Sequence, residues 1–213
     1  AGARRVQLIE EPIAAAIGAG LPISEATGSM IVDIGGGTTE IAVMSLGGVV
    51  FSKSLRIAGD AMDGAIINYM RKKFNLLIGE STAEKIKKEI GTAIPTTNHI
   101  FLMKGRDIRT GTPKEISLTE EDACEALMPI LSQMLSAIKE ALESTPPELS
   151  ADLVDMGLVL TGGGALLKNI DKLISKDTGL PVTIADNPLE CVATGTGKAL
   201  ENEELFSTML SEY

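Results

Sequence analysis

The stretch Met30-Ile31-Val32-Asp33-Ile34-Gly35-Gly36-Gly37-Thr38-Thr39-Glu40 joins an apolar, β-branched run to three consecutive glycines. A second stretch, Gly157-Leu158-Val159-Leu160-Thr161-Gly162-Gly163-Gly164, repeats this order of features. Each predicts a β-strand that ends in a loop without side chains. Such a loop lets a phosphate or a sugar approach the backbone N–H groups closely. We therefore predict that the two loops hold one nucleotide from two sides, the second loop at the start of a helix.

The spacing around the first triplet excludes two common phosphate loops. It has neither the Gly-x-x-x-x-Gly-Lys-Ser/Thr pattern nor the Gly-x-Gly-x-x-Gly pattern that precedes a helix. Residues 38–46 and 49–56 instead alternate around Gly47-Gly48, which predicts a hairpin. Asp33, the last polar residue before the loop, is expected to point into the space that the loop encloses. The alternative is a tight turn in which Asp33 caps its own backbone.

The composition is that of a globular chain with an acidic excess. Of 213 residues, 44% are hydrophobic and 23% are charged, and the net charge is −10. A negative chain repels the phosphates of nucleic acids and of anionic membranes, so neither is expected to bind these residues directly. Cys124, Cys191 and His99 show no paired or clustered spacing, which favours a reduced compartment, unreactive thiols and no metal site at the histidine. No apolar run reaches the length of a bilayer span.

Residue periodicity predicts two nested α/β units. Three strands within 28–56, with further strands at 152–161 and 180–185, predict one mixed sheet. An insertion at about 58–124 is expected to hold helices at 60–74 and 82–90, the latter capped by Gly91, and a hairpin near 98–103. The residues Thr119-Glu120-Glu121-Asp122 predict a capping box that starts a helical stretch to about 143, which Pro129 divides in two. Helices are also expected at 165–175 and from Asn187-Pro188 to about 200, where Gly195 and Gly197 indicate close packing, in the family named below against the first domain.

Three segments occur in an order that resembles a known superfamily. They are Leu8-Ile9-Glu10-Glu11-Pro12-Ile13-Ala14-Ala15-Ala16-Ile17-Gly18, the first glycine stretch and Leu160-Thr161-Gly162-Gly163-Gly164, and they resemble the actin/Hsp70/sugar-kinase superfamily. Together with 57–63 and 82–91, they are similar to the MreB family of bacterial actins. The resemblance implies an α/β, actin-like ATPase fold: a ribonuclease H-like mixed sheet flanked by helices, with a smaller α/β insertion. It implies a larger subdomain at 28–57 and 125–213, a smaller one at 58–124, and an interdomain helix and linker at 1–27.

The family also has a region that this sequence does not show. Its members begin with a domain that carries another phosphate hairpin, of the Asp-x-Gly-Thr type, and the helix or loop that contacts the membrane. This sequence, which opens at Ala1-Gly2-Ala3-Arg4-Arg5, resembles the second half of such a protein. We therefore expect membrane contact only through regions outside these residues. We also expect that the isolated chain binds ATP weakly and is inactive as an ATPase.

Glu11 is the candidate for the chemistry of phosphate hydrolysis. A carboxylate can orient a water in line with the scissile bond and accept its proton. Pro12 is typical of a first helical turn, which would put Glu11 at a helix entrance where the dipole favours its ionised form. The resemblance implies that Glu11 positions the attacking water together with Thr38. The alternative is that Glu10 and Glu11 only favour the helix N-terminus.

The resemblance distributes the rest of the nucleotide site over four places. Asp33 would hold a water on Mg²⁺ without touching the ion, and Gly35, Gly36 and Gly37 would donate N–H groups to the β- and γ-phosphates. Glu84 and Lys87 share a helical face, so the carboxylate can reach ribose hydroxyls while the lysine stem lies along the base. Gly162, Gly163 and Gly164 would lie against the adenosine. The alternatives are a solvated charged face at 80–89 and a glycine loop that only lets a helix pack closely.

The expected function is that of a cytoskeletal protein. It would bind ATP and Mg²⁺ in an interdomain cleft, form filaments with copies of itself and determine rod cell shape. Cell-shape membrane proteins are the implied partners, and the cytoplasm at the inner face of the membrane is the implied location. An Hsp70-type or sugar-kinase-like ATPase is the alternative within the superfamily. A degenerate half that binds nothing is the alternative outside it.

Overall fold

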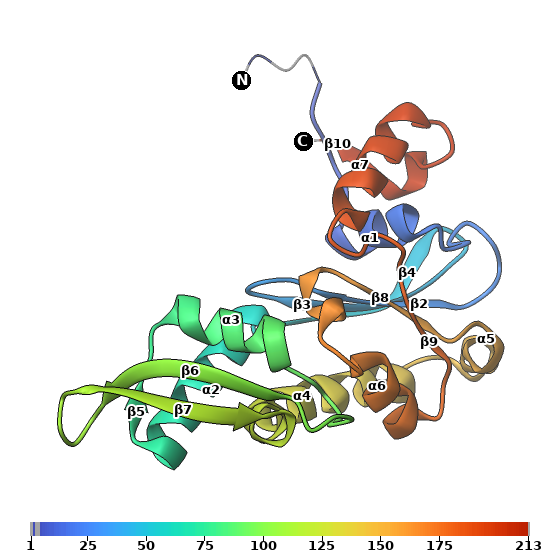
Figure 1. The fold of residues 1–213 in the computed structure, drawn as a ribbon. Helices are drawn as coiled ribbons and strands as arrows, with labels where there is room; N and C mark the ends of the chain where they lie inside the picture. Colours follow the sequence, from blue (N-terminus) through green and yellow to red (C-terminus); the bar gives the residue numbers. More distant parts are fainter. Residues whose placement is uncertain (1, 3–4, 213) are drawn as a thin grey trace.

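The central sheet grows from the first glycine stretch. β2 (Ser29–Ile34), β3 (Thr39–Ser45) and β4 (Gly48–Leu55) are antiparallel neighbours, while β8 (Leu158–Thr161) and β9 (Val182–Ile184) follow β2 in parallel, in the order β4-β3-β2-β8-β9. The computed structural model, drawn in Figure 1, describes residue 2 and residues 5–212. Its mixed sheet flanked by helices confirms the predicted fold class.

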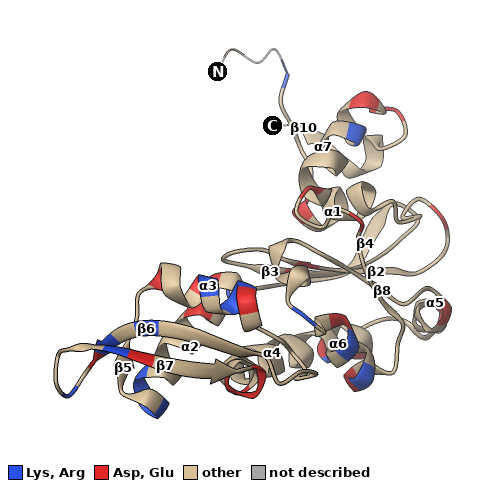
Figure 2. Cartoon of the chain, viewed as in Figure 1, with Lys and Arg blue, Asp and Glu red and all other residues tan. Residues whose placement is uncertain are grey.

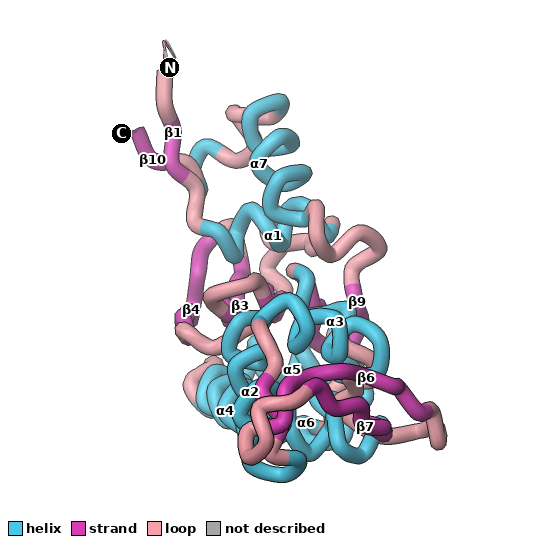
Figure 3. Tube along the Cα trace, turned by 60° about the vertical axis from the view of Figure 1, so that its left-hand side comes forward, coloured by secondary structure: helices cyan, strands magenta, loops and turns pink. Residues whose placement is uncertain are grey.

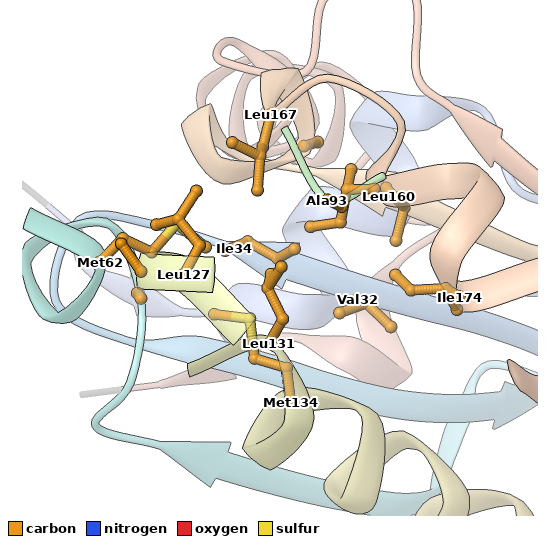
Figure 4. Packing of buried hydrophobic residues seen from close by; sticks show 14 of the residues in the cluster. Val32, Ile34, Met62, Ala93, Leu127, Leu131, Met134, Leu160, Leu167 and Ile174 are labelled. Atoms are coloured by element: carbon orange, nitrogen blue, oxygen red, sulfur yellow. The ribbon is translucent and has the colours of Figure 1, made fainter. Parts of the chain in front are cut away.

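Helices cover both faces of this sheet. α1 (Glu11–Ala19) and α7 (Cys191–Glu201) lie on one face, and α4 (Glu120–Glu143) and α6 (Ile170–Thr178) lie on the other (Figure 1). Successive residues of a strand point to opposite faces, so Ile31 packs in the core with α1, while Val32 and Ile34 pack with α4 (Figure 4). As a result β2 is buried along its whole length, as a strand covered on both faces should be.

A smaller unit follows β4. It contains α2 (Gly59–Phe74), β5 (Leu76–Leu77), α3 (Glu80–Ile90), β6 (Ile100–Asp107) and β7 (Pro113–Thr119), and its strands form a separate sheet in the order β5-β6-β7. Figure 3 shows this unit in front of the larger sheet. The capping box on Asp122 and Thr119 starts α4 directly after β7, and α4 then continues beneath the larger sheet. The boundary predicted near 124 therefore falls within a helix.

The remaining elements connect these layers. α5 (Pro147–Met156) precedes β8, η1 (Gly163–Leu166) follows it, and η2 (Ser207–Met209) lies near the end of the chain. β1 (Gln7–Leu8) pairs with β10 (Ser211–Glu212), so the segments near the two ends of the chain lie side by side, next to α7 (Figure 3). Among the described residues, no helix combines the length and the apolar character that crossing a bilayer requires.

Pro129 does not divide the helical stretch, contrary to our prediction. α4 is continuous over 24 residues. A proline removes one helical hydrogen bond and crowds the preceding turn, but Pro129 lies on the exposed side, where water can reach the freed carbonyl. Leu127, Leu131 and Met134 are buried on the other side and hold both halves of the helix against the sheet. Packing of the buried side of α4 therefore outweighs the free-energy cost of a proline within the helix.

Three other boundaries also differ from the prediction. Residues 152–156 belong to α5 and not to a strand, because Pro147 occupies the first helical turn and restarts a helix after Thr145 and Pro146. The helix predicted at 165–175 is divided between η1 and α6, and α7 begins at Cys191, after a turn at Pro188. In the last two cases a turn separates the strand from the helix, so α6 and α7 begin later than predicted.

Two glycines explain the close contact of α1 with α7. A methyl group on Gly195 would lie 1.7 Å from the Ala14 carbonyl oxygen, and one on Gly18 would lie 1.8 Å from the Cys191 carbonyl oxygen. Gly195 therefore packs against a helix of this chain, which corrects the prediction that it packs against a first domain. A methyl group on Gly197 would meet no described atom within 4 Å, so no packing within the described chain requires this glycine.

Candidate functional site

A cavity of about 900 Å³ lies where the ends of β2 and β8 face α2 and α3. Most of the residues singled out from the sequence line it: Glu11, Asp33, Gly35, Gly36, Glu84, Lys87, Gly162, Gly163 and Gly164. Gly37 and Thr38 belong to the same turn as Gly35 and Gly36 but do not contribute to the lining. The fold thus brings together segments that lie as far apart in sequence as Glu11 and Gly164.

The first glycine loop is a turn that α2 supports from behind. The Gly35 N–H donates to the Thr38 carbonyl at 2.9 Å and closes the turn between β2 and β3. The N–H groups of Gly59 and Asp60, at the start of α2, donate to the carbonyls of Gly35 and Gly36 at 3.2 and 2.8 Å. The N–H groups of Gly36 and Gly37 have no hydrogen-bond partner within the described residues. The loop carbonyls therefore serve the fold, while two of its amides are left for other partners.

The second glycine loop has a different reason for its composition. Gly162 has φ 78° and ψ 170°, a backbone region that is essentially restricted to glycine, and a methyl group there would lie 2.3 Å from the Ile34 carbonyl oxygen. A methyl group on Gly164 would lie 2.2 Å from Ile34 Cγ2, whereas one on Gly163 would meet only the flexible end of Leu189, at 3.2 Å. Close packing on β2 thus explains two of these three glycines.

Acidic side chains gather beside the first loop. Asp33 is 4% exposed and accepts a hydrogen bond from Thr161 Oγ1 at 2.6 Å. Glu40 is its direct partner across the β2–β3 pair and lies on the same face of the sheet. Burial, and after it the charge of Glu40, raise the pKa of Asp33, although the Thr161 hydrogen bond lowers it. A cation at this end of the sheet would relieve that repulsion.

Glu11 is the first residue of α1 and faces the same cavity, as its position before Pro12 predicted. Its pKa is raised, by burial first and then by the charges of Asp33 and Glu40. We expected the helix N-terminus to favour the ionised form, whereas burial and the two carboxylates disfavour it. The helix dipole, whose effect on a surface group is about 0.3–1 kcal/mol, acts in the opposite direction.

α3 presents both acidic and basic residues to the cavity (Figure 2). Lys87 Nζ donates to the Gly59 carbonyl and to Asp63 Oδ2, both at 2.9 Å. Glu84 pairs instead with Lys88 at 2.7 Å, one helical turn on. The ammonium group of Lys87 is thus held by α2, while its side chain contributes to the cavity wall.

Several cavity residues were not predicted as functional. Asp60 lines it from the first turn of α2 and Asp63 from the second, and Asp63 Oδ1 is buried without a hydrogen-bond partner among the described residues. Glu40 and Thr161 act on Asp33 without lining the cavity. The hairpin register would have identified Glu40, since a turn at 35–38 pairs it with Asp33. Within the described part of the chain, no three His, Cys, Asp or Glu side chains are arranged to hold a metal ion.

Comparison with known proteins gives consistent matches. The MreB/Mbl protein family matches residues 1–208. The cell shape-determining protein MreB of Escherichia coli (strain K12) is 58% identical over 202 residues, which cover 94% of this chain and 58% of that protein. The crystal structure of MreB5 of Spiroplasma citri bound to AMPPNP is 40% identical with a TM-score of 0.88, over 92% of this chain and 59% of that one.

A more distant match extends the structural likeness. The MamK double helical filament is 25% identical with a TM-score of 0.72, over 90% of this chain and 58% of that one. This chain spans little more than half the length of the proteins that it matches. The mixed sheet, the glycine loops that follow β2 and β8, and the family match agree. The chain belongs to the MreB/Mbl family of cell shape-determining, actin-like proteins.

Proposed function

We propose that this chain forms one wall of an adenine-nucleotide site, with ATP and Mg²⁺ as ligands, in a filament-forming protein that determines cell shape. The observation that carries the proposal is the first glycine loop. None of its three glycines has a left-handed backbone, and a methyl group on Gly36 or Gly37 would meet nothing closer than Asp60 Oδ1 at 3.8 Å. Packing within the described chain therefore does not explain the missing side chains at Gly36 and Gly37. The approach of an external group to the free amides does.

The comparisons support an adenine nucleotide as that group. MreB5 of Spiroplasma citri has been solved with AMPPNP and with ADP, and it is 40% identical to this chain in both cases. The cavity of about 900 Å³ has room for a ligand of that size. In our proposal the first loop binds the phosphates. Glu84, Lys87 and the second loop line the part of the cavity that holds the nucleoside.

The acidic side chains fit a divalent cation that is held mostly through water. Mg²⁺ keeps several of its waters and is commonly bound through one or two carboxylates and the substrate phosphates. Asp33, buried next to Glu40 and fixed by Thr161, fits the role of orienting one metal-bound water. When bound, the ion would neutralise charge on the phosphates.

Glu11 fits the role of the group that orients the attacking water. Its raised pKa makes it a better proton acceptor than a carboxylate with the ordinary value, and it lines the same cavity as the two loops. Thr38, in the turn that the Gly35 N–H closes, is proposed to hold the same water through its hydroxyl. Hydrolysis would then begin with a water placed between Glu11 and the terminal phosphate.

Self-association is the second part of the proposal. A relative with the same fold forms a double helical filament, and filaments require heterologous contacts that do not close on themselves. We propose that copies of the intact protein assemble in this way at the inner face of the membrane, together with cell-shape membrane proteins. The matches are to MreB and Mbl, so an Hsp70-type or sugar-kinase-like role is not favoured.

Calorimetric titration of the intact protein with Mg-AMPPNP tests the proposal. We expect saturable binding at one site, which Gly36→Ala weakens and Gly64→Ala does not. Gly64 lies in α2, and a methyl group there would meet nothing within 4 Å, so it is a control for a methyl group at another open position. Electron microscopy with Mg-ATP should show filaments. Absence of binding in the unmodified protein would refute the proposal.

A further inference from the structure

The two walls of the nucleoside half of the cavity come from distant parts of the chain. α3 and Gly91 form one wall, and 162–168 form the other. Immediately behind their junction, the segment after α3 meets the segment after η1. Thr92 and Lys168 form an isolated parallel β-bridge, and the Ala93 N–H donates to the Lys168 carbonyl at 2.8 Å. This junction connects the smaller unit to the second glycine loop.

Asn169 lies at the centre of the junction. Its Nδ2 donates to Thr92 Oγ1 at 3.1 Å and to the Ile94 carbonyl at 2.9 Å. Thr92 is fully buried, and its hydroxyl lies 2.6 Å from the Ile94 carbonyl and 3.2 Å from the Lys168 carbonyl. A single amide group thus joins α6 to the buried turn that ends α3. On the other side of the same side chain, Oδ1 accepts from Lys172 Nζ at 2.9 Å.

The backbone conformation at position 169 favours an asparagine there. It has φ 60° and ψ 18°, the left-handed region that asparagine tolerates better than most residues. It stands at the N-cap of α6 but makes no side-chain cap, since its amide points to Thr92 and Ile94 instead. The usual reason for an asparagine at a helix start is therefore absent. The contact with the smaller unit takes its place.

Lys168 strengthens the same junction from the cavity side. Its Nζ donates to the Glu89 carbonyl at 2.7 Å, near the C-terminus of α3, where a cation is favoured by the helix dipole. Lys168 itself lines the cavity. Both sides of the junction thus act on the end of the helix that carries Glu84 and Lys87.

We propose that Asn169 and Thr92 form a clamp that positions α3 against the second glycine loop and thereby sets the width of the nucleoside pocket. Asn169 is a positioning residue in this proposal, because it does not line the cavity. The proposal rests on the nucleotide site proposed above. It predicts that loss of the clamp weakens the binding of the nucleoside and leaves the phosphate loop intact.

The test is Asn169→Gly in the intact protein. Glycine adopts the left-handed backbone freely, so this variant removes the two hydrogen bonds without adding strain. We expect the Kd for Mg-ADP to rise about tenfold, the effect of losing one or two buried hydrogen bonds. The Kd for Mg-tripolyphosphate, which has no nucleoside, should stay within about twofold. Thr92→Val should weaken ADP binding similarly. Thr92→Ser, which keeps the hydroxyl, should bind ADP as tightly as the unmodified protein.

Lys172→Ala is the matched control. It removes the contact on the other side of the Asn169 side chain and should leave both affinities unchanged. Unchanged ADP affinity in Asn169→Gly would overturn the proposal, as would equal losses for ADP and tripolyphosphate, which a merely structural role would give.

Hydrogen exchange separates this proposal from the proposed function. Without any nucleotide, the amides of 86–94 should exchange faster in Asn169→Gly than in the unmodified protein, because the end of α3 has lost its anchor. If the unmodified protein bound no nucleotide, the proposed function would fail. Faster exchange at 86–94 would still support the clamp, and unchanged exchange would overturn it.

Discussion

The two glycine triplets look alike in sequence and differ in what they do for the fold. Gly162 and Gly164 lie against Ile34, where a side chain would collide with the backbone or the side chain of β2. Gly36 and Gly37 have open space around them, and their amides have no partner among the described residues. The second loop is therefore required for folding, and the first is free to serve a ligand. A glycine motif indicates a ligand site only after its packing has been examined.

The largest effect should come from Glu11, which lines the same cavity as the first loop. Glu11→Gln keeps the shape of the side chain and removes the proton acceptor, so the ATP hydrolysis rate of the intact protein should fall about 10²–10⁴-fold. Nucleotide affinity should change little, because the residue is proposed to contact water. Single-turnover hydrolysis and calorimetric titration measure the two quantities. Glu10→Gln is the control, and a loss of turnover there in place of Glu11 would shift the assignment by one residue.

The comparison predicts that the second loop is the one sensitive to a methyl group. Gly162→Ala combines a backbone conformation reserved for glycine with overlap on Ile34, so the free energy of unfolding should fall by roughly 3 kcal/mol or more. Urea denaturation measures this loss. Gly197→Ala is the control, since it adds a methyl group to an open position in α7. It should stabilise the chain by about 0.5–1 kcal/mol. Equal stability of the two variants would contradict the packing explanation.

The first loop should show the opposite behaviour. Gly36→Ala should leave the free energy of unfolding within about 0.5 kcal/mol of the unmodified value, because the position is open. Affinity for Mg-ADP should fall about tenfold, since a methyl group keeps phosphate oxygens from the amides. Denaturation and titration of the same sample give both values. If Gly36→Ala destabilised the fold as much as Gly162→Ala, the two loops would not differ as we infer.

The sequence predicted the fold class and part of the cavity lining through the order of its motifs and the family that this order resembles. β2 is a continuous apolar run, as a strand between two layers of helices requires, and β4 alternates between exposed and half-buried residues. Asp33 and Glu11 were found for a similar reason: each stands at the end or the start of a recognisable element. The capping box at Thr119 is local and was also predicted correctly.

What the sequence did not predict depends on contacts between distant residues. Pro129 is tolerated because the opposite side of α4 is buried, and no local pattern shows that. The raised pKa of Glu11 results from burial and from two carboxylates on other elements. The packing of Gly164 on Ile34 joins residues that are far apart along the chain. Each outcome follows from a tertiary contact that outweighs a local preference.

The smallest predicted effect concerns Asp33. This residue lies near the end of β2, the strand that leads into the first loop and against which the second loop packs. Its pKa is raised in the folded protein, chiefly by burial, so the folded state binds more protons than the unfolded state between the ordinary pKa and the raised one. Stability should therefore fall as the pH rises through that interval and level off above the raised pKa. Asp33→Asn can still accept the hydrogen bond from Thr161 but carries no charge. It should remove this decline and stabilise the nucleotide-free protein at neutral pH by about 1 kcal/mol, as substitutions at functional sites commonly do.

Urea denaturation of both proteins between pH 3.5 and about pH 8 measures the difference, since carboxylates titrate in the lower part of that range. Thr161→Val is the matched control. It removes the hydrogen bond that favours the ionised carboxylate, so it should steepen the decline that Asp33→Asn removes. A decline that persists unchanged in Asp33→Asn would assign the pH dependence to other carboxylates, Glu11 first among them. The pH dependence of stability would then arise mainly from the carboxylate at the start of α1 and not from the one in β2.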